Sequence, residues 1–244
     1  MSGVRIAMWS GPRNISTAML RSFGNRADCW VTDEPLYACY LQASGAPHPM
    51  REQVLASQSC DWREVTDWLT GPIPHGRSVW YQKHMTHHLL DPIGRDWLDG
   101  LTNCFLIRDP RRVLASYARK REHSVRVEDV GMLQQAAIFD EVVARQDGHI
   151  PPVLDAADVL RDPATTLQRF CEAVGIPFDP AMLSWPPGRR ETDGVWAPHW
   201  YERVERSTGF ETPPAPPAEL PPELERLAEQ CQPAYERLRA HVPT

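Results

Sequence analysis

The 244-residue sequence has little lysine and no long apolar run. Only Lys83 and Lys120 are lysines, so 24 of the 26 basic residues are arginines. No stretch approaches the roughly 20 apolar residues that a membrane-spanning helix needs. The apolar part of residues 1–9 is too short for a signal peptide, so we expect a cytoplasmic protein without a membrane span. A net charge of −6 argues against a nucleic-acid binder held by a broad basic face.

The sequence also lacks cysteine pairs with metal-binding spacing. Its six cysteines, at positions 29, 39, 60, 104, 171 and 231, form no CxxC pair. We therefore expect reduced, mostly buried thiols rather than a disulfide framework. The length suits one domain of ordinary size with a sizeable core.

Short apolar runs alternate with stretches of helical periodicity. Strands are predicted at residues 4–9, 79–81, 104–107 and 152–154. Helices are predicted at residues 16–23, 111–120, 131–144 and 162–175. The alternation predicts an α/β fold of three layers, with helices on both faces of a central, mostly parallel sheet. In such sheets, ligands bind beyond the carboxyl ends of the strands.

Composition divides the chain into three parts. Residues 1–211 carry the alternating pattern and form the expected α/β domain. Residues 212–222 contain six prolines and no core pattern, which predicts a stiff linker. Residues 223–244 carry an apolar stripe at helical spacing, which predicts a C-terminal helix packed on the domain, with a kink at Pro233.

The first predicted strand ends in a turn that suits an anion. A helix start presents unpaired N–H groups and a partial positive charge, and here Arg13 adds a full charge. The turn departs from the nucleotide-hydrolase pattern GxxxxGK[ST], because Ser16 replaces the second glycine and Thr17 replaces the lysine. Plain helix capping is the alternative. The residues expected to contact the anion are Gly11, Pro12, Arg13, Asn14, Ile15, Ser16 and Thr17.

A second basic segment follows the predicted strand at 104–107. Residues 108–121 hold six basic side chains against one acid. Arg108 stands where a magnesium-dependent nucleotidase often carries an aspartate as metal partner, so an arginine there favours neutralisation of an anion by side chains. Asp109 keeps a metal site open as an alternative.

The third basic segment comprises residues 189–200. Arg189 and Arg190 lie in a loop flanked by glycine and proline, together with Trp196 and Trp200. Two interpretations stay open. The arginines hold a phosphate while an indole covers a base, or the tryptophans simply anchor the loop.

Together the three segments resemble the sulfotransferases that use 3′-phosphoadenosine 5′-phosphosulfate (PAPS), a branch of the P-loop nucleotide-binding fold. Residues 12–17 match the bacterial motif Pro-Arg-Ser-Gly-Thr/Ser-Thr except at Asn14 and Ile15. Arg108 and Ser116 have the spacing of the second family motif. Residues 189–199 are in register with the third motif, in which a glutamate here replaces a glycine. The resemblance covers residues 4–210.

This resemblance implies PAPS as the donor, adenosine 3′,5′-bisphosphate as the product and no required metal. Arg13 and the backbone N–H groups of residues 14–17 would hold the phosphosulfate. The acceptor would be a hydroxyl or an amine of a small molecule, which the sequence leaves unidentified, as it does the oligomeric state. The 3′-phosphate would be held by Arg108, Ser116, Arg189 and Arg190.

Two side chains compete for the role of base. Glu34 follows the first predicted helix and a short apolar pair, and some bacterial sulfotransferases use a glutamate at a comparable place. Residues 83–88 resemble the Lys-Thr-His stretch that supplies a histidine base in eukaryotic members, with His84 one position out of register. His84 and His88 would share a metal if they lay on one helix face, although no third ligand is obvious. We favour Glu34, which alternatively only pairs with Arg13 or another loop arginine.

Residues 37–74 are rich in proline, tryptophan and histidine with little periodicity, and we expect them to form the acceptor wall and lid. Two other functions stay open on the same fold. One is a phosphoryl-transfer enzyme that uses a nucleoside triphosphate, against which the missing P-loop lysine weighs. The other is a non-catalytic nucleotide sensor.

Overall fold

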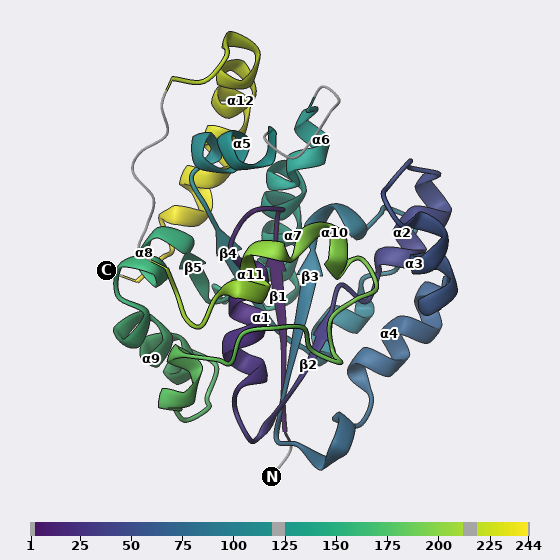
Figure 1. Cartoon of the computed structure of the whole chain (residues 1–244), viewed down its shortest axis with the longest axis vertical. Helices are drawn as coiled ribbons and strands as arrows, with labels where there is room; N and C mark the ends of the chain where they lie inside the picture. The colour runs from purple at the N-terminus through teal and green to yellow at the C-terminus, as the bar shows by residue number, and fades with distance from the viewer. Residues whose placement is uncertain (1–2, 119–124, 212–218, 244) are drawn as a thin grey trace.

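The computed structural model describes residues 3–118, 125–211 and 219–243 (Figure 1). Within them, five parallel strands form one sheet in the order β2-β3-β1-β4-β5. This confirms the predicted α/β fold with a parallel central sheet. The strands are β1 (Val4–Ser10), β2 (Cys29–Asp33), β3 (Val79–Met85), β4 (Thr102–Ile107) and β5 (Val153–Asp155).

Helices cover both faces of the sheet, which makes three layers. Side chains alternate along β1, so Ile6 and Met8 lie in one apolar cluster while Ala7 and Trp9 lie in the other. The first cluster is covered by α1 (Ser16–Gly24), α8 (Ala156–Arg161) and α9 (Pro163–Ala173). The second is covered by α4 (Trp62–Thr70), α7 (Met132–Arg145) and α12 (Pro222–Arg239).

The remaining described α-helices lie around the carboxyl end of the sheet and at its β2 side (Figure 1). They are α2 (Tyr37–Ser44), α3 (Arg51–Ser57), α5 (Pro110–Ala118), α6 (Val127–Val130), α10 (Ala197–Trp200) and α11 (Glu202–Arg206). Residues 37–74 therefore contain three helices in spite of their weak periodicity. Burial of Tyr37, Leu41 and Val54 in a shared cluster stabilises helices that are too short to form alone.

His84 and His88 do not lie on one helix face, which was the condition for a shared metal. β3 runs four residues beyond the predicted strand, to Met85, so His84 lies in the strand and His88 in a 3-10 turn (Thr86–His88). Pairing with β1 along Val4–Ser10 extends the strand. No group of three or more potential metal ligands occurs among the described residues.

The helix α12 packs through Leu224, Ala228 and Cys231 against α5 and α6, and it continues through Pro233. Residues 212–218 of the predicted linker lie outside the described residues, and the division into three parts stays a prediction. All six cysteines are free thiols, and five of them are buried, as expected. Among the described helices, none is long and apolar enough to cross a membrane.

Candidate functional site

The turn between β1 and α1 has an unusual backbone. Arg13 and Ile15 adopt φ angles of 63° and 59°, in the left-handed region that a β-branched residue such as Ile15 strongly disfavours. Such strain persists only where the surrounding structure imposes it, and it concentrates at functional sites. Here the Asn14 side chain donates to the Leu106 carbonyl at 3.0 Å, and Arg108 donates to the Arg13 carbonyl at 2.6 Å. Both bonds tie the turn to the end of β4.

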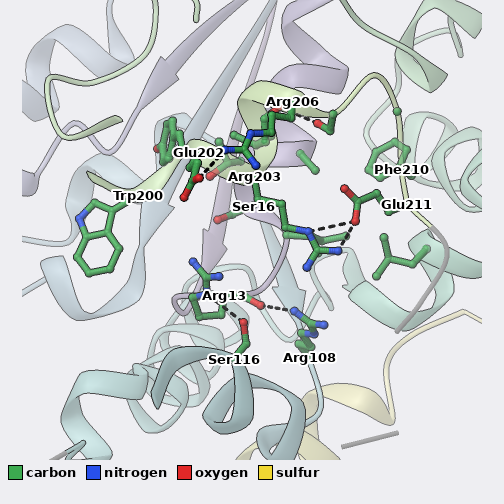
Figure 2. Close-up of a pocket in the computed structure, with 18 residues that line it drawn as sticks. Arg13, Ser16, Arg108, Ser116, Trp200, Glu202, Arg203, Arg206, Phe210 and Glu211 are labelled. Atoms are coloured by element: carbon green, nitrogen blue, oxygen red, sulfur yellow. Dashed lines mark hydrogen bonds and ion pairs between the residues drawn. The ribbon is translucent and has the colours of Figure 1, made fainter. Parts of the chain in front are cut away.

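A cavity of about 510 Å³ opens beyond this turn (Figure 2). Arg13 and Ser116, which are 103 positions apart, meet there with the Arg13 Nε 3.2 Å from the Ser116 Oγ. The opposite wall is formed by most residues of the segment 200–211, which includes α11. The predicted donor-binding residues that line the cavity are Arg13, Ile15, Ser16, Thr17, Arg108 and Ser116.

Gly11, Pro12 and Asn14 do not line this cavity, and the Asn14 side chain is fully buried. Arg189 and Arg190 do not line it either. The Arg189 Nε lies 3.8 Å from the Glu205 Oε1, and the Arg190 backbone N–H donates to the Asp193 Oδ2 at 2.8 Å.

Two arginines of α11 line the cavity instead. Arg203 forms an ion pair with Glu211, and Arg206 forms one with Glu202 at 2.5 Å (Figure 2). No sequence motif indicated these two residues, although Arg203 and Arg206 stand three positions apart on one helix, directly after the tryptophan-rich segment.

The electrostatics of the cavity favour an anion. Burial, together with the positive charges of Arg112, Arg13 and Arg203, lowers the pKa of Arg108 to about 10. Neighbouring guanidinium groups therefore repel one another across this wall. An anion bound between them relieves the repulsion, so the residues present fit a phosphate or a phosphosulfate.

A buried ionic cluster borders the cavity through Tyr201. The Lys83 Nζ lies 2.8 Å from the Asp33 Oδ1, 2.6 Å from the Glu34 Oε1 and 2.7 Å from the Tyr201 hydroxyl oxygen. The Tyr201 hydroxyl in turn donates to the Asp33 Oδ2 at 2.6 Å. Although burial opposes it, the two carboxylates hold the pKa of Lys83 well above its ordinary value. Lys83 therefore stays charged inside the protein.

The structure separates the two candidate bases. Burial raises the pKa of Glu34 above its ordinary value, in spite of the opposing charge of Lys83, and 11% of its side chain stays exposed. His84 points to the opposite face of the sheet, where its ring stacks on Trp9 with centroids 4.5 Å apart. Burial lowers the pKa of His84 to about 3. Glu34 pairs with Lys83 rather than with Arg13, which is the arginine partner considered from the sequence.

The segment that carries Arg190 and Trp196 is anchored to the rest of the domain by buried polar contacts. Arg21 of α1 binds both oxygens of Asp193, one of them at 2.7 Å, and the two side chains are 2% and 0% exposed. The Gly194 N–H donates to Asp33 at 3.2 Å. The loop is thus tied to α1 and to the end of β2.

These features define the class of protein: a parallel α/β protein with an arginine-lined cavity at the turn after its first strand. A family model described as a sulfotransferase domain matches residues 4–242. The chain therefore belongs to the sulfotransferase family, as the sequence motifs indicated.

Two Arabidopsis thaliana proteins are similar over nearly the whole chain. Branched-chain-amino-acid aminotransferase-like protein 2 is 35% identical over 239 residues, and the corresponding protein 1 is 36% identical over 238 residues. Each match covers 97% of this chain and 42% of the relative. The chain thus spans less than half the length of these curated relatives.

Solved structures of bacterial sulfotransferases share the fold. The sulfotransferase from Alicyclobacillus acidocaldarius is 12% identical with a TM-score of 0.57, over 100% of this chain and 98% of that one. The sulfotransferase domain from the curacin biosynthetic pathway is 15% identical with a TM-score of 0.55, over 95% and 98%. At these identities the similarity concerns the fold alone.

Proposed function

We propose that this sulfotransferase takes a sulfuryl group from PAPS and transfers it to a hydroxyl or an amine of a small molecule. The observation that carries the proposal is the arginine-lined cavity at the β1–α1 turn, beside a buried Glu34–Lys83 pair. Its volume of about 510 Å³ lies within the range of small-molecule and nucleotide sites.

The donor is held through its two anionic ends. Arg13 and the N–H groups at the start of α1 bind the 5′-phosphosulfate, since a helix start and a guanidinium both favour negative charge. Arg108 and Ser116 bind the 3′-phosphate, with Arg203 on the facing wall of the cavity. Arg189 and Arg190 stay predicted contacts of the 3′-phosphate from the motif register.

Sulfuryl transfer requires a base for the acceptor and charge relief for the leaving phosphate. Glu34 accepts the proton from the acceptor hydroxyl or amine, and a raised pKa makes a carboxylate a better base. Arg13 stabilises the negative charge that develops on the leaving phosphate. His84 is the second candidate base, and its place on the other face of the sheet favours Glu34.

Calorimetry with adenosine 3′,5′-bisphosphate, AMP and ATP tests the donor assignment. We expect the bisphosphate to bind at least about tenfold more tightly than AMP, because a buried charge-assisted contact contributes more than 1.4 kcal/mol. Arg108→Gln should abolish this preference, whereas the control Arg145→Gln, in a surface ion pair with Asp99, should keep it. Equal binding of the bisphosphate and AMP would refute the 3′-phosphate site.

Transfer from labelled PAPS to a panel of hydroxyl and amine acceptors tests the reaction itself. Glu34→Gln should abolish transfer while bisphosphate binding is retained; full activity in this variant would refute Glu34 as base. Tight ATP binding with magnesium-dependent turnover would support phosphoryl transfer instead. Tight bisphosphate binding without transfer to any acceptor would support a sensor.

A further inference from the structure

The two carboxylates of the buried cluster around Lys83 accept different sets of hydrogen bonds. The three ammonium hydrogens of Lys83 match three acceptors: Asp33, Glu34 and the Tyr201 hydroxyl, all within 2.8 Å. One cation thus faces two carboxylates. When both carboxylates are ionised the cluster carries one net negative charge, which favours uptake of one proton by the pair; the hydrogen-bond partners of each carboxylate decide which one takes it.

Asp33 accepts more hydrogen bonds than Glu34. Its two oxygens accept from Lys83, from the Tyr201 hydroxyl at 2.6 Å and from the Gly194 N–H at 3.2 Å. The Glu34 carboxylate accepts from Lys83 alone within the described part of the chain. Hydrogen bonds to the charged form of a carboxylate lower its affinity for protons, so the unequal donor set leaves Glu34 as the proton acceptor.

We propose that Asp33 and Tyr201 are positioning residues that hold Lys83 and stay out of the proton transfer, which leaves that step to Glu34. The inference rests on the proposed function, in which Glu34 is the base. It assigns roles to two side chains that no motif indicated. Tyr201 also lines the donor cavity, so one side chain touches both the donor site and the ionic cluster.

The other titratable groups near Glu34 do not carry a competing charge. Tyr201 stays a neutral phenol, because burial and Asp33 raise its pKa well above the ordinary value. His88, from the turn after β3, interacts with Lys83, but burial and the neighbouring histidines lower its pKa well below the ordinary value. Asp33 and Lys83 are therefore the charges that set the proton affinity of Glu34.

Carboxyl ¹³C NMR, titrated from pH 3 to pH 9 without any ligand, tests the inference without an activity measurement. The Glu34 signal is assigned by its loss in Glu34→Gln. We expect its midpoint above the ordinary glutamate value in the wild type and lower by about one pH unit or more in Asp33→Asn, because Lys83 then faces Glu34 as its one carboxylate. An unchanged or higher midpoint in Asp33→Asn would overturn the inference.

Tyr201→Phe is the second test, and it keeps the ring that lines the cavity. We expect kcat to fall at least tenfold while the Kd for adenosine 3′,5′-bisphosphate changes less than threefold. Tyr235→Phe is the matched control, since Tyr235 donates to Asp155 at 2.6 Å through the same chemistry outside the described cavity. If the Kd for the bisphosphate rises by the same factor as kcat falls, Tyr201 only holds its loop in place, and the positioning role is refuted.

The two experiments separate this inference from the proposed function. If the NMR midpoint moves as expected but the acid limb of kcat/KM does not follow it, Glu34 is not the base and the positioning of its charge still stands. If the wild type transfers a sulfuryl group to no acceptor, the proposed function fails. The Glu34 midpoints of the wild type and of Asp33→Asn still show whether Asp33 raises the proton affinity of Glu34.

Discussion

The buried ion pair between Arg21 and Asp193 offers a sharp test of how the structure supports its donor site. The pair joins α1 to the loop that carries Arg190, and both side chains are at most 2% exposed. Removal of one partner leaves the other charge buried without compensation, which costs about 3–5 kcal/mol. We therefore expect Arg21→Met to lower the free energy of unfolding by that amount.

For a chain of this size, 1 kcal/mol corresponds to about 2–4 °C in Tm, so the expected loss is about 6–20 °C. Urea unfolding and calorimetry measure both quantities. The double variant Arg21→Met/Asp193→Asn should recover part of the loss, because no unpaired charge stays buried. The control Arg145→Met removes the partly exposed pairs with Asp96 and Asp99 and should cost less than about 1 kcal/mol. A cost for Arg21→Met as small as that of the control would refute the reasoning.

Three further predictions follow from the site. Ile15→Gly should be about 1 kcal/mol more stable than Ile15→Ala in urea unfolding, because φ is 59° there and only glycine adopts that angle without strain; the reverse order would contradict the strained turn. Glu211→Gln should tighten bisphosphate binding about two- to fivefold at low salt and less at high salt, since it releases Arg203, whereas Arg203→Gln should weaken it; equal affinities by calorimetry would exclude Arg203 from the donor site. Activity should fall as the pH drops through a value above the ordinary glutamate pKa, because Glu34 acts in its ionised form and burial raises its pKa; a kcat/KM profile that stays flat down to pH 4 would contradict this role.

Local sequence determined the framework of this protein. Apolar runs and helix-start signals predicted a parallel α/β sheet, and the sheet places strand ends together at one edge. The family resemblance placed Arg13, after β1, and Arg108, after β4, in one donor site, and in the structure Arg108 donates to the Arg13 carbonyl. Arg108 directly follows β4 and Arg13 lies in the turn after β1, so their positions depend on short-range signals and on one general rule.

The partners of Lys83 and the arginines of the cavity were decided by the tertiary structure. Lys83 and Tyr201 are 118 positions apart, and they meet because α10 and α11 lie over the carboxyl end of the sheet. Similarly, the motif register pointed to Arg189, whereas Arg203 lines the cavity because the loop between them is anchored through Asp193 to Arg21. Residue type and spacing indicate which strand end a side chain follows. Only the packing of distant segments decides which charges are buried together, because burial and long-range pairing leave no periodic pattern in the sequence.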